Sequence, residues 1–167
     1  TLDISISSKT QNILDNLTKP KGSLGELEEI VKKVAVITGL EKPKITKKFV
    51  FVVAADHDVV EENVSAYSQE VTYQMVLNFL NNGAAINVFS KHIGCEVIVV
   101  DAGVKKGFNI TNNKNFKIKK VNNGARNFTK GPALTKQEVE SLVLSGFSLV
   151  EELIKNYKIE KDENFLV

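Results

Sequence analysis

The sequence predicts an α/β fold in which a parallel sheet is flanked by helices. Two short apolar runs, residues 49–55 and 96–100, are rich in β-branched side chains and indicate strands buried on both faces. A helical pattern over residues 69–90 separates them, and the runs end at Asp56 and Asp101. Strand, helix and strand in this order form a βαβ unit, whose two strands lie parallel.

The first 40 residues are expected to form a helical segment, and residues 41–167 the first part of the α/β domain. Apolar side chains over residues 4–17 indicate a helix that ends before Pro20. Ser23 and Glu26 have the spacing of a capping box, in which each side chain bonds a free backbone N–H of the first turn. The stripe predicted to be buried on the helix that follows consists of Leu27, Ile30, Val31, Val34 and Ala35.

A single helix is expected between the two strands, over residues 69–90, with Ser68 as its cap. Residues 82–85, with the sequence Asn-Gly-Ala-Ala, place small side chains inside it. Such a stretch permits the close approach of another backbone. A core contact, a dimer contact and a ligand contact explain it equally well.

The remainder of the chain is predicted to add one short strand and one long helix. Residues 105–131 are polar and indicate a long connection with a strand around 116–121. A helix begins at Thr135, where Glu138 completes a second capping box. Its predicted apolar face comprises Val139, Leu142, Val143, Phe147, Val150 and Ile154. Phe165–Val167 resembles the opening of a third buried strand, so the chain is expected to be cut inside a larger protein, the alternative being a frayed tail.

Composition and charge exclude several classes of function. The formal net charge is +2, which is too small to indicate nucleic acid or an acidic membrane as a partner. No apolar run is long enough to cross a bilayer. The single cysteine, Cys95, cannot form an internal disulfide, which favours the cytoplasm. His57, His92 and Cys95 lack the spacing of zinc ligands, so no metal site of that type is expected.

Polar side chains gather where the two predicted strands end, which is where ligands bind in open α/β sheets. Asp56, His57, Asp58 and Asp101 could therefore position a ligand. The alternative is that the aspartates accept hydrogen bonds from nearby backbone N–H groups. His57 is either a general base or a hydrogen-bonded loop histidine. The three aspartates also leave open a metal-dependent phosphohydrolase, which would bind Mg²⁺ or Mn²⁺.

Two polar loops and the cysteine are weaker candidates. Residues 19–25 form a basic, glycine-containing loop before a helix, where phosphates often bind. The spacing is not that of a P-loop, and the capping box already explains these residues. Residues 122–127 form a turn rich in hydrogen-bond donors, and such turns are more often solvated than anion-binding. Cys95 opens a buried strand and is expected to be an inert core residue.

Four segments together resemble the nicotinate-nucleotide–dimethylbenzimidazole phosphoribosyltransferase family, in the order and approximate spacing of its amino-terminal half. They are KPKGSLGELE (19–28), AADHDVVEENVSAYSQEVTYQMVLNFLNNGAAINVF (54–89), VVDAGV (99–104) and GARNFTKGPALT (124–135). The resemblance implies a Rossmann-like three-layer parallel sheet with flanking helices, incomplete in this chain, and a homodimer. It also implies a reaction without a cofactor. Nicotinate mononucleotide and an aromatic base give α-ribazole phosphate, the source of the cobalamin lower ligand, and free nicotinate.

The resemblance places the aromatic base against residues 64–79. It implies base-binding positions at Ser65, Tyr67, Gln74 and Met75, supported by a rim of Asp56, His57 and Asp101. Some family members carry serine and glutamine at the positions of Tyr67 and Met75. A more apolar pocket is therefore expected in this chain, and its preferred base is open.

This chain differs from the family in what it covers and at two backbone positions. The family's catalytic glutamate and its glycine- and threonine-rich phosphate loop lie downstream of the matching region. No catalytic residue is therefore assigned in this chain, which alone is expected to be inactive. The family also favours glycine at the positions of Asp58 and Asn63, residue types that tolerate a left-handed backbone. Besides the phosphohydrolase, a non-catalytic nucleotide-binding or dimerisation module is the remaining alternative.

Overall fold

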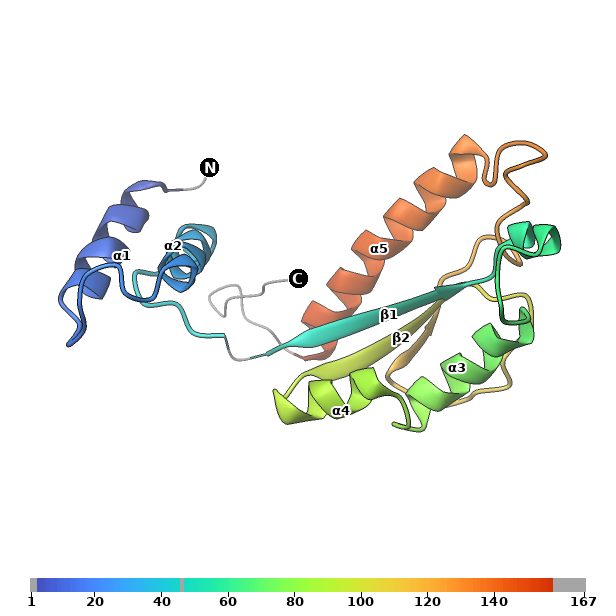
Figure 1. Ribbon diagram of the computed structural model, residues 1–167, viewed down its shortest axis with the longest axis horizontal. Coiled ribbons are helices and arrows are strands. Elements are labelled where there is room, and N and C mark those ends of the chain that lie inside the picture. The colour runs from blue at the N-terminus through green and yellow to red at the C-terminus, as the bar shows by residue number, and fades with distance from the viewer. Residues whose placement is uncertain (1–2, 46, 158–167) are drawn as a thin grey trace. The chain divides into compact units, whose positions relative to one another are not determined.

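The computed structural model describes residues 3–45 and 47–157 (Figure 1). The chain divides into two compact units, with the boundary in the first part of the chain between Lys47 and Lys48. The strand predicted at 165–167 lies outside the described residues. Within those residues, no helix has the length and apolar character that crossing a membrane requires.

The first unit contains two helices, α1 (Ser5–Asp15) and α2 (Glu26–Thr38), which pack against each other. The predicted helix over 4–17 is therefore confirmed, with Ile6 and Leu14 buried. The Thr10 hydroxyl, also buried, donates to the carbonyl oxygen of Glu41 at 3.1 Å. This bond ties α1 to the segment that follows α2.

The predicted start of α2 is wrong. The cap is Gly25, with a φ of 56°, and no side chain bonds the free N–H groups as Ser23 and Glu26 were expected to. Glu28 instead stabilises the turn before the helix, because its carboxylate accepts from the backbone N–H of Leu24 at 3.2 Å and from the Lys19 ammonium at 2.7 Å. The Lys19 hydrogen bond, followed by the Leu24 N–H, lowers the pKa of Glu28.

The buried face of α2 matches the predicted stripe only in part. As predicted, Ala35 is buried and Val31 and Val34 are half-buried. Leu27 and Ile30 are 59% and 52% exposed, and Glu28 is buried instead. Residues 28 and 35 are seven apart and share one helix face, and residues 27 and 30 belong to the neighbouring one. The buried face therefore includes the carboxylate of Glu28, which is ion-paired with Lys19. A search for apolar residues at helical spacing does not find such a residue.

The second unit is built on a three-stranded parallel sheet of order β1-β2-β3, comprising β1 (Phe49–Ala55), β2 (Glu96–Gly103) and β3 (Phe116–Ile118). The predicted parallel α/β class is confirmed. Phe49 pairs with Glu96 at one end, and Ala55 pairs with Gly103 at the other across a one-residue irregularity. Both strands therefore deliver their carboxyl ends to the same edge. Burial on both faces holds for the centre of β2 but not for β1, where Val53 is 63% exposed.

Helices cover the two faces of this sheet (Figure 1). On one face, Val99, Val104 and Phe116 pack with Val76 of α3 (Glu70–Leu80). On the other, the alternate residues of β2 pack against α5 (Lys136–Asn156), where Ile98 and Val100 meet Leu149 and Leu153. This alternation follows from the period of two along a strand. The result is a three-layer arrangement.

The helix predicted over 69–90 is two helices, α3 and α4 (Ala85–His92). The break falls between Leu80 and Ala85, where Asn82 has a left-handed φ of 59°, so residues 82–84 lie outside both helices. Asn87 holds the junction, its side chain accepting from Ala84 N–H at 3.2 Å and donating to the Phe79 carbonyl at 3.0 Å. Ser68 is not the cap of α3, which begins after Gln69 without a side-chain bond.

The capping box of α5 is confirmed. The Thr135 hydroxyl accepts from the Glu138 N–H at 3.2 Å, and the Glu138 carboxylate accepts from the Thr135 N–H at 2.7 Å. The predicted apolar face is only partly the buried one. Leu142, Val150 and Ile154 are half-buried, but Val143 and Phe147 are 55% and 67% exposed. The buried residues are Leu149 and Leu153. Apolar side chains lie on two faces of this helix. The face that carries Leu149 and Leu153 is buried because it packs against Ile98 and Val100 of β2.

Candidate functional site

The two buried aspartates at the carboxyl edge of the sheet both hold backbone amides. Asp56, only 4% exposed, follows β1, and its Oδ2 accepts from the Lys105 N–H at 2.7 Å. Asp101 lies within β2, and its Oδ1 accepts from the N–H groups of Gly103 at 3.0 Å and Val104 at 2.8 Å. These contacts support the structural role for both residues. They fix the two loops that leave the sheet at this edge.

One oxygen of each carboxylate, Asp56 Oδ1 and Asp101 Oδ2, is buried without a hydrogen-bond partner among the described residues. Lys120 lies nearest to the second, with its Nζ 3.6 Å from Asp101 Oδ2 and 2.9 Å from the carbonyl oxygen of Val104. Lys120 therefore supplies a compensating positive charge to the Asp101 carboxylate without a direct hydrogen bond.

The other two members of the polar edge, His57 and Asp58, are less buried than the two aspartates. His57 is exposed, and its carbonyl oxygen accepts from Gln69 Nε2 at 3.4 Å. Asp58 forms an ion pair with Lys105 at 2.6 Å, and this hydrogen bond raises the pKa of the lysine. In the parts of the chain that the structure describes, no three His, Cys, Asp or Glu side chains gather as metal ligands do. Asp56, Asp58 and Asp101, the aspartates of the phosphohydrolase alternative, are therefore not gathered as a set of metal ligands in this part of the chain.

A cavity of about 350 Å³ opens where β1 ends, between the 3₁₀ helix Asp58–Glu62 and the start of α3. Five of the residues predicted from the sequence line it: Asp56, His57, Ser65, Tyr67 and Met75. Gln74 and Asp101 do not. Gln74 lies one position from Met75 on α3, about a quarter-turn around the helix, and the Asp101 side chain turns towards the amides of residues 103 and 104.

The remaining lining is mostly apolar and includes residues that the sequence analysis did not single out. They are Ala55, Val59, Val60, Val64, Ser68, Gln69, Val71 and Thr72. On α3, residues 71, 72 and 75 share one face at spacings of three and four, and Ser68 precedes the helix at the same spacing. This spacing is a signal that could have identified them. Val59 and Val60 carried no such signal, because their orientation depends on the 3₁₀ helix.

The polar and aromatic side chains of the cavity differ in how firmly they are held. The Ser65 hydroxyl accepts from the Tyr67 N–H at 3.1 Å and so shapes the turn before α3. Tyr67 itself is 72% exposed and Met75 is 36% exposed. Asn63 ends the 3₁₀ helix with a left-handed φ of 57°, the conformation expected of an asparagine in place of glycine. Tyr67 and Met75 thus line the cavity while part of each residue remains exposed to solvent.

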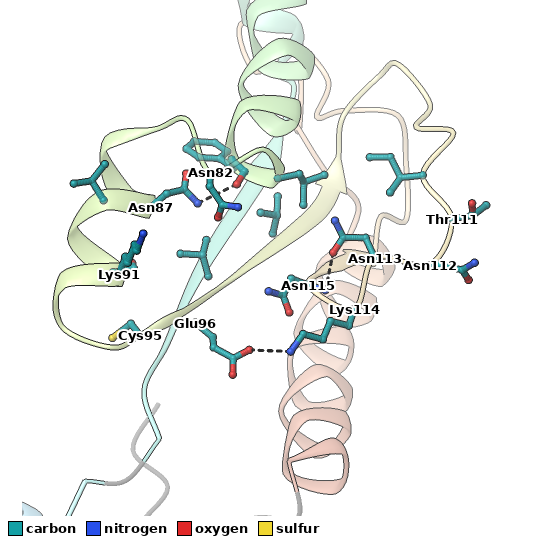
Figure 2. A pocket seen from close by; sticks show the side chains of 17 residues that line it. Asn82, Asn87, Lys91, Cys95, Glu96, Thr111, Asn112, Asn113, Lys114 and Asn115 are labelled. Atoms are coloured by element: carbon teal, nitrogen blue, oxygen red, sulfur yellow. Dashed lines mark hydrogen bonds and ion pairs between the residues drawn. The ribbon is translucent and has the colours of Figure 1, made fainter.

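A larger cavity of about 1080 Å³ lies at the other end of the strands, beside the start of β2 (Figure 2). Its wall includes the amide groups of Asn82, Asn87 and the loop 111–115. Figure 2 shows Glu96 facing Lys114 across it, at 3.6 Å. Free Cys95 also lies on this wall, half-buried. Because open α/β sheets bind ligands at the carboxyl ends of their strands, the smaller cavity is the better candidate.

The turn at 122–127 is not a free set of donors. Arg126 makes a bidentate ion pair with Glu138, both N–O distances being 2.7 Å, and Asn122 donates to the same carboxylate at 3.0 Å. Asn127 donates to Glu62 at 2.6 Å. These side-chain donors are used within the protein.

The fold and the cavity define an α/β protein with an apolar slot at the carboxyl edge of a parallel sheet. A family model described as Phosphoribosyltransferase (DBI_PRT) matches residues 1–159. The chain therefore belongs to this phosphoribosyltransferase family.

Curated relatives and solved structures agree with this assignment. The chain is 47% identical over 150 residues to the nicotinate-nucleotide–dimethylbenzimidazole phosphoribosyltransferase of Geobacter sp. strain M21, covering 90% of this chain and 42% of that protein. The protein of the same name from Prosthecochloris aestuarii is also 47% identical, over 92% of this chain and 43% of its own length. The crystal structure of CobT from Thermus thermophilus matches with a TM-score of 0.84 and 41% identity, over 91% of this chain and 45% of that one. The chain thus spans less than half the length of these relatives.

Proposed function

We propose that this chain forms the base-binding part of an enzyme that transfers ribose phosphate from nicotinate mononucleotide to dimethylbenzimidazole or a related aromatic base. The observation that carries the proposal is the cavity beside Asp56, which is lined by Ser65, Tyr67 and Met75. These residues belong to the segment that the family resemblance assigns to the base. They lie at the edge of the sheet where such folds bind ligands.

The chemistry of the cavity suits a flat heterocycle. Its volume of about 350 Å³ falls in the range of roughly 300–1,000 Å³ typical of small-molecule sites. Valine side chains supply most of the apolar wall, and Tyr67 is free to lie over a bound ring because it is largely exposed. Aromatic stacking and apolar enclosure would hold the base, and few polar contacts would orient it.

The proposed reaction is a glycosyl transfer. An unprotonated imidazole nitrogen of the base attacks the anomeric carbon of nicotinate mononucleotide. The bond from that carbon to the pyridinium nitrogen breaks, and nicotinate leaves with its ring nitrogen neutral. A carboxylate takes the proton from the attacking base. None of these 167 residues is assigned that role, because the matching glutamate of the family lies downstream. From the resemblance we also propose that the protein is a homodimer. The single free cysteine further favours a reducing cytoplasmic location.

Equilibrium dialysis tests the proposal with dimethylbenzimidazole as the ligand and chromatography of α-ribazole phosphate as the second readout. We expect saturable binding of the base but no product from the chain and both substrates. Tyr67→Ala should weaken binding several-fold, since a stacking aromatic contributes about 1 kcal/mol. Phe89→Ala is the matched control, because Phe89 is similarly exposed (67%) and does not line the cavity. Equal loss in both variants would contradict the assignment, and product from the chain alone would mean that the catalytic group is misplaced.

A further inference from the structure

The wall of the cavity is fastened to a distant loop. The backbone N–H of Ala125 donates to the carbonyl oxygen of Asp56 at 2.8 Å. The backbone N–H of Asp58 donates to the carbonyl oxygen of Ala125, also at 2.8 Å. These two bonds form a parallel bridge on either side of His57. The bridge fixes the first residues of the turn that carries the 3₁₀ helix.

A second attachment holds the far end of the same helix. Glu62 accepts from Asn127 Nδ2 at 2.6 Å and from the Thr129 hydroxyl at 3.3 Å, and Lys130 pairs with Glu61 at 2.9 Å. Asn127 is 6% exposed, so its bond is shielded from water. Residues 124–130, which we call the strap, thus hold the 3₁₀ helix at both ends.

The strap is itself anchored on α5. Arg126 binds both oxygens of Glu138 at 2.7 Å, a bidentate pair of the strong, directional kind. Its backbone N–H donates to the carbonyl oxygen of Ala133 at 3.0 Å. α5 packs on the sheet through Leu149 and Leu153. The Arg126–Glu138 ion pair therefore fixes the position of the strap relative to the core of the second unit.

No residue of the strap lines the cavity, and neither does Glu138. Val59 and Val60, on the 3₁₀ helix between the two attachments, do line it. We infer that Arg126 and Glu138 are positioning residues: their ion pair holds the strap, and through it sets the valine wall against which the aromatic base binds. The inference rests on the proposed function for the identity of the ligand.

Glu138→Gln separates the ion pair from the helix cap, because glutamine at the third helical position still completes a capping box. The matched control is Glu152→Gln, on the same helix, where the carboxylate pairs with Lys117 and Lys119, which lie outside the strap. Both variants remove one negative charge from α5. Arg126→Lys keeps the charge but loses the bidentate geometry and should behave as an intermediate.

The experiment measures amide hydrogen exchange at Ala125 and Asp58, and the affinity for dimethylbenzimidazole by equilibrium dialysis. We expect Glu138→Gln to speed exchange at both amides roughly tenfold and to weaken base binding several-fold. Amides in the centre of β2 should exchange as in the parent chain. Glu152→Gln should change neither quantity.

Unchanged exchange at Ala125 and Asp58 in Glu138→Gln would overturn the anchoring role. Faster exchange with unaltered affinity would overturn the link between strap and base, while leaving the proposed function standing. A parent chain that binds no base would overturn the proposed function and the link together, whereas the exchange measurements would still decide the anchoring.

Discussion

Gly124 lies directly against the main chain of Asp56. A Cβ at position 124 would come within 3.0 Å of the Asp56 carbonyl oxygen, and Gly124 has a φ of 95°, where side chains are rarely tolerated. The loop that follows β3 is therefore packed onto the turn that ends β1. This contact places the strap beside the candidate cavity.

Replacing this glycine should strain both the backbone and the contact. We expect Gly124→Ala to lower the free energy of unfolding by about 1–3 kcal/mol, as measured by urea denaturation. Gly146→Ala is the control with the opposite sign. Gly146 lies inside α5, where an added Cβ meets nothing within 4 Å, so alanine should stabilise the helix by about 0.5–1 kcal/mol. Equal effects of the two substitutions would refute the close contact.

The carboxylate of Asp101 should matter for stability more than for ligand binding. It is 1% exposed and accepts from two backbone amides. Asp101→Ala leaves both N–H groups unpaired in the interior and should cost about 2–4 kcal/mol in urea denaturation. Asp101→Asn keeps one acceptor oxygen and should cost less. If alanine and asparagine were equally mild, the amide contacts would have little energetic weight.

The ion pair of Glu138 predicts a specific dependence of stability on pH. The hydrogen bond from Arg126, followed by the Thr135 N–H, lowers the pKa of Glu138 from 4.5 to about 2. A carboxyl group with a lowered pKa stabilises the fold fully above its ordinary pKa and loses that contribution as the pH falls through the lowered value. The melting temperature of the parent chain should therefore fall between about pH 4.5 and 2.

The corresponding variant should show less of this fall. Glu138→Gln is expected to start with a lower melting temperature at neutral pH and to approach the parent chain as the pH drops. If the melting temperatures of the two proteins fell by the same amount as the pH drops across this range, the fold would not be holding the Glu138 carboxylate in its ionised form.

The sequence predicted the sheet well because its signals are local. Phe49–Ala55 is an uninterrupted apolar run, and the capping box at Thr135 and Glu138 depends on four neighbouring residues. The polar residues at the carboxyl edge of the sheet could be predicted because they directly follow or end the two apolar runs. The family resemblance, not the pattern, suggested Tyr67 and Met75.

Most of the failures have a different cause, which is tertiary context, but the break between α3 and α4 is an exception. Asn82 and Gly83 form an Asn-Gly pair, a local turn signal, and Asn82 has a left-handed φ of 59°. Glu28 is buried because Lys19 pairs with it, nine residues away. The strap was invisible because the bonds from Ala125 to Asp56 and from Asn127 to Glu62 join segments more than sixty residues apart.

The side chain of Met75 offers the most direct test of the central claim, because it is the only methionine among the 167 residues. A chain labelled with ¹³C in the methionine methyl group gives one signal, and that methyl belongs to a residue that lines the cavity. Titration with dimethylbenzimidazole should shift this signal saturably upfield, because an aromatic ring bound in the slot lies over the methyl group. Saturable binding of the base with an unmoved methionine signal would contradict the account.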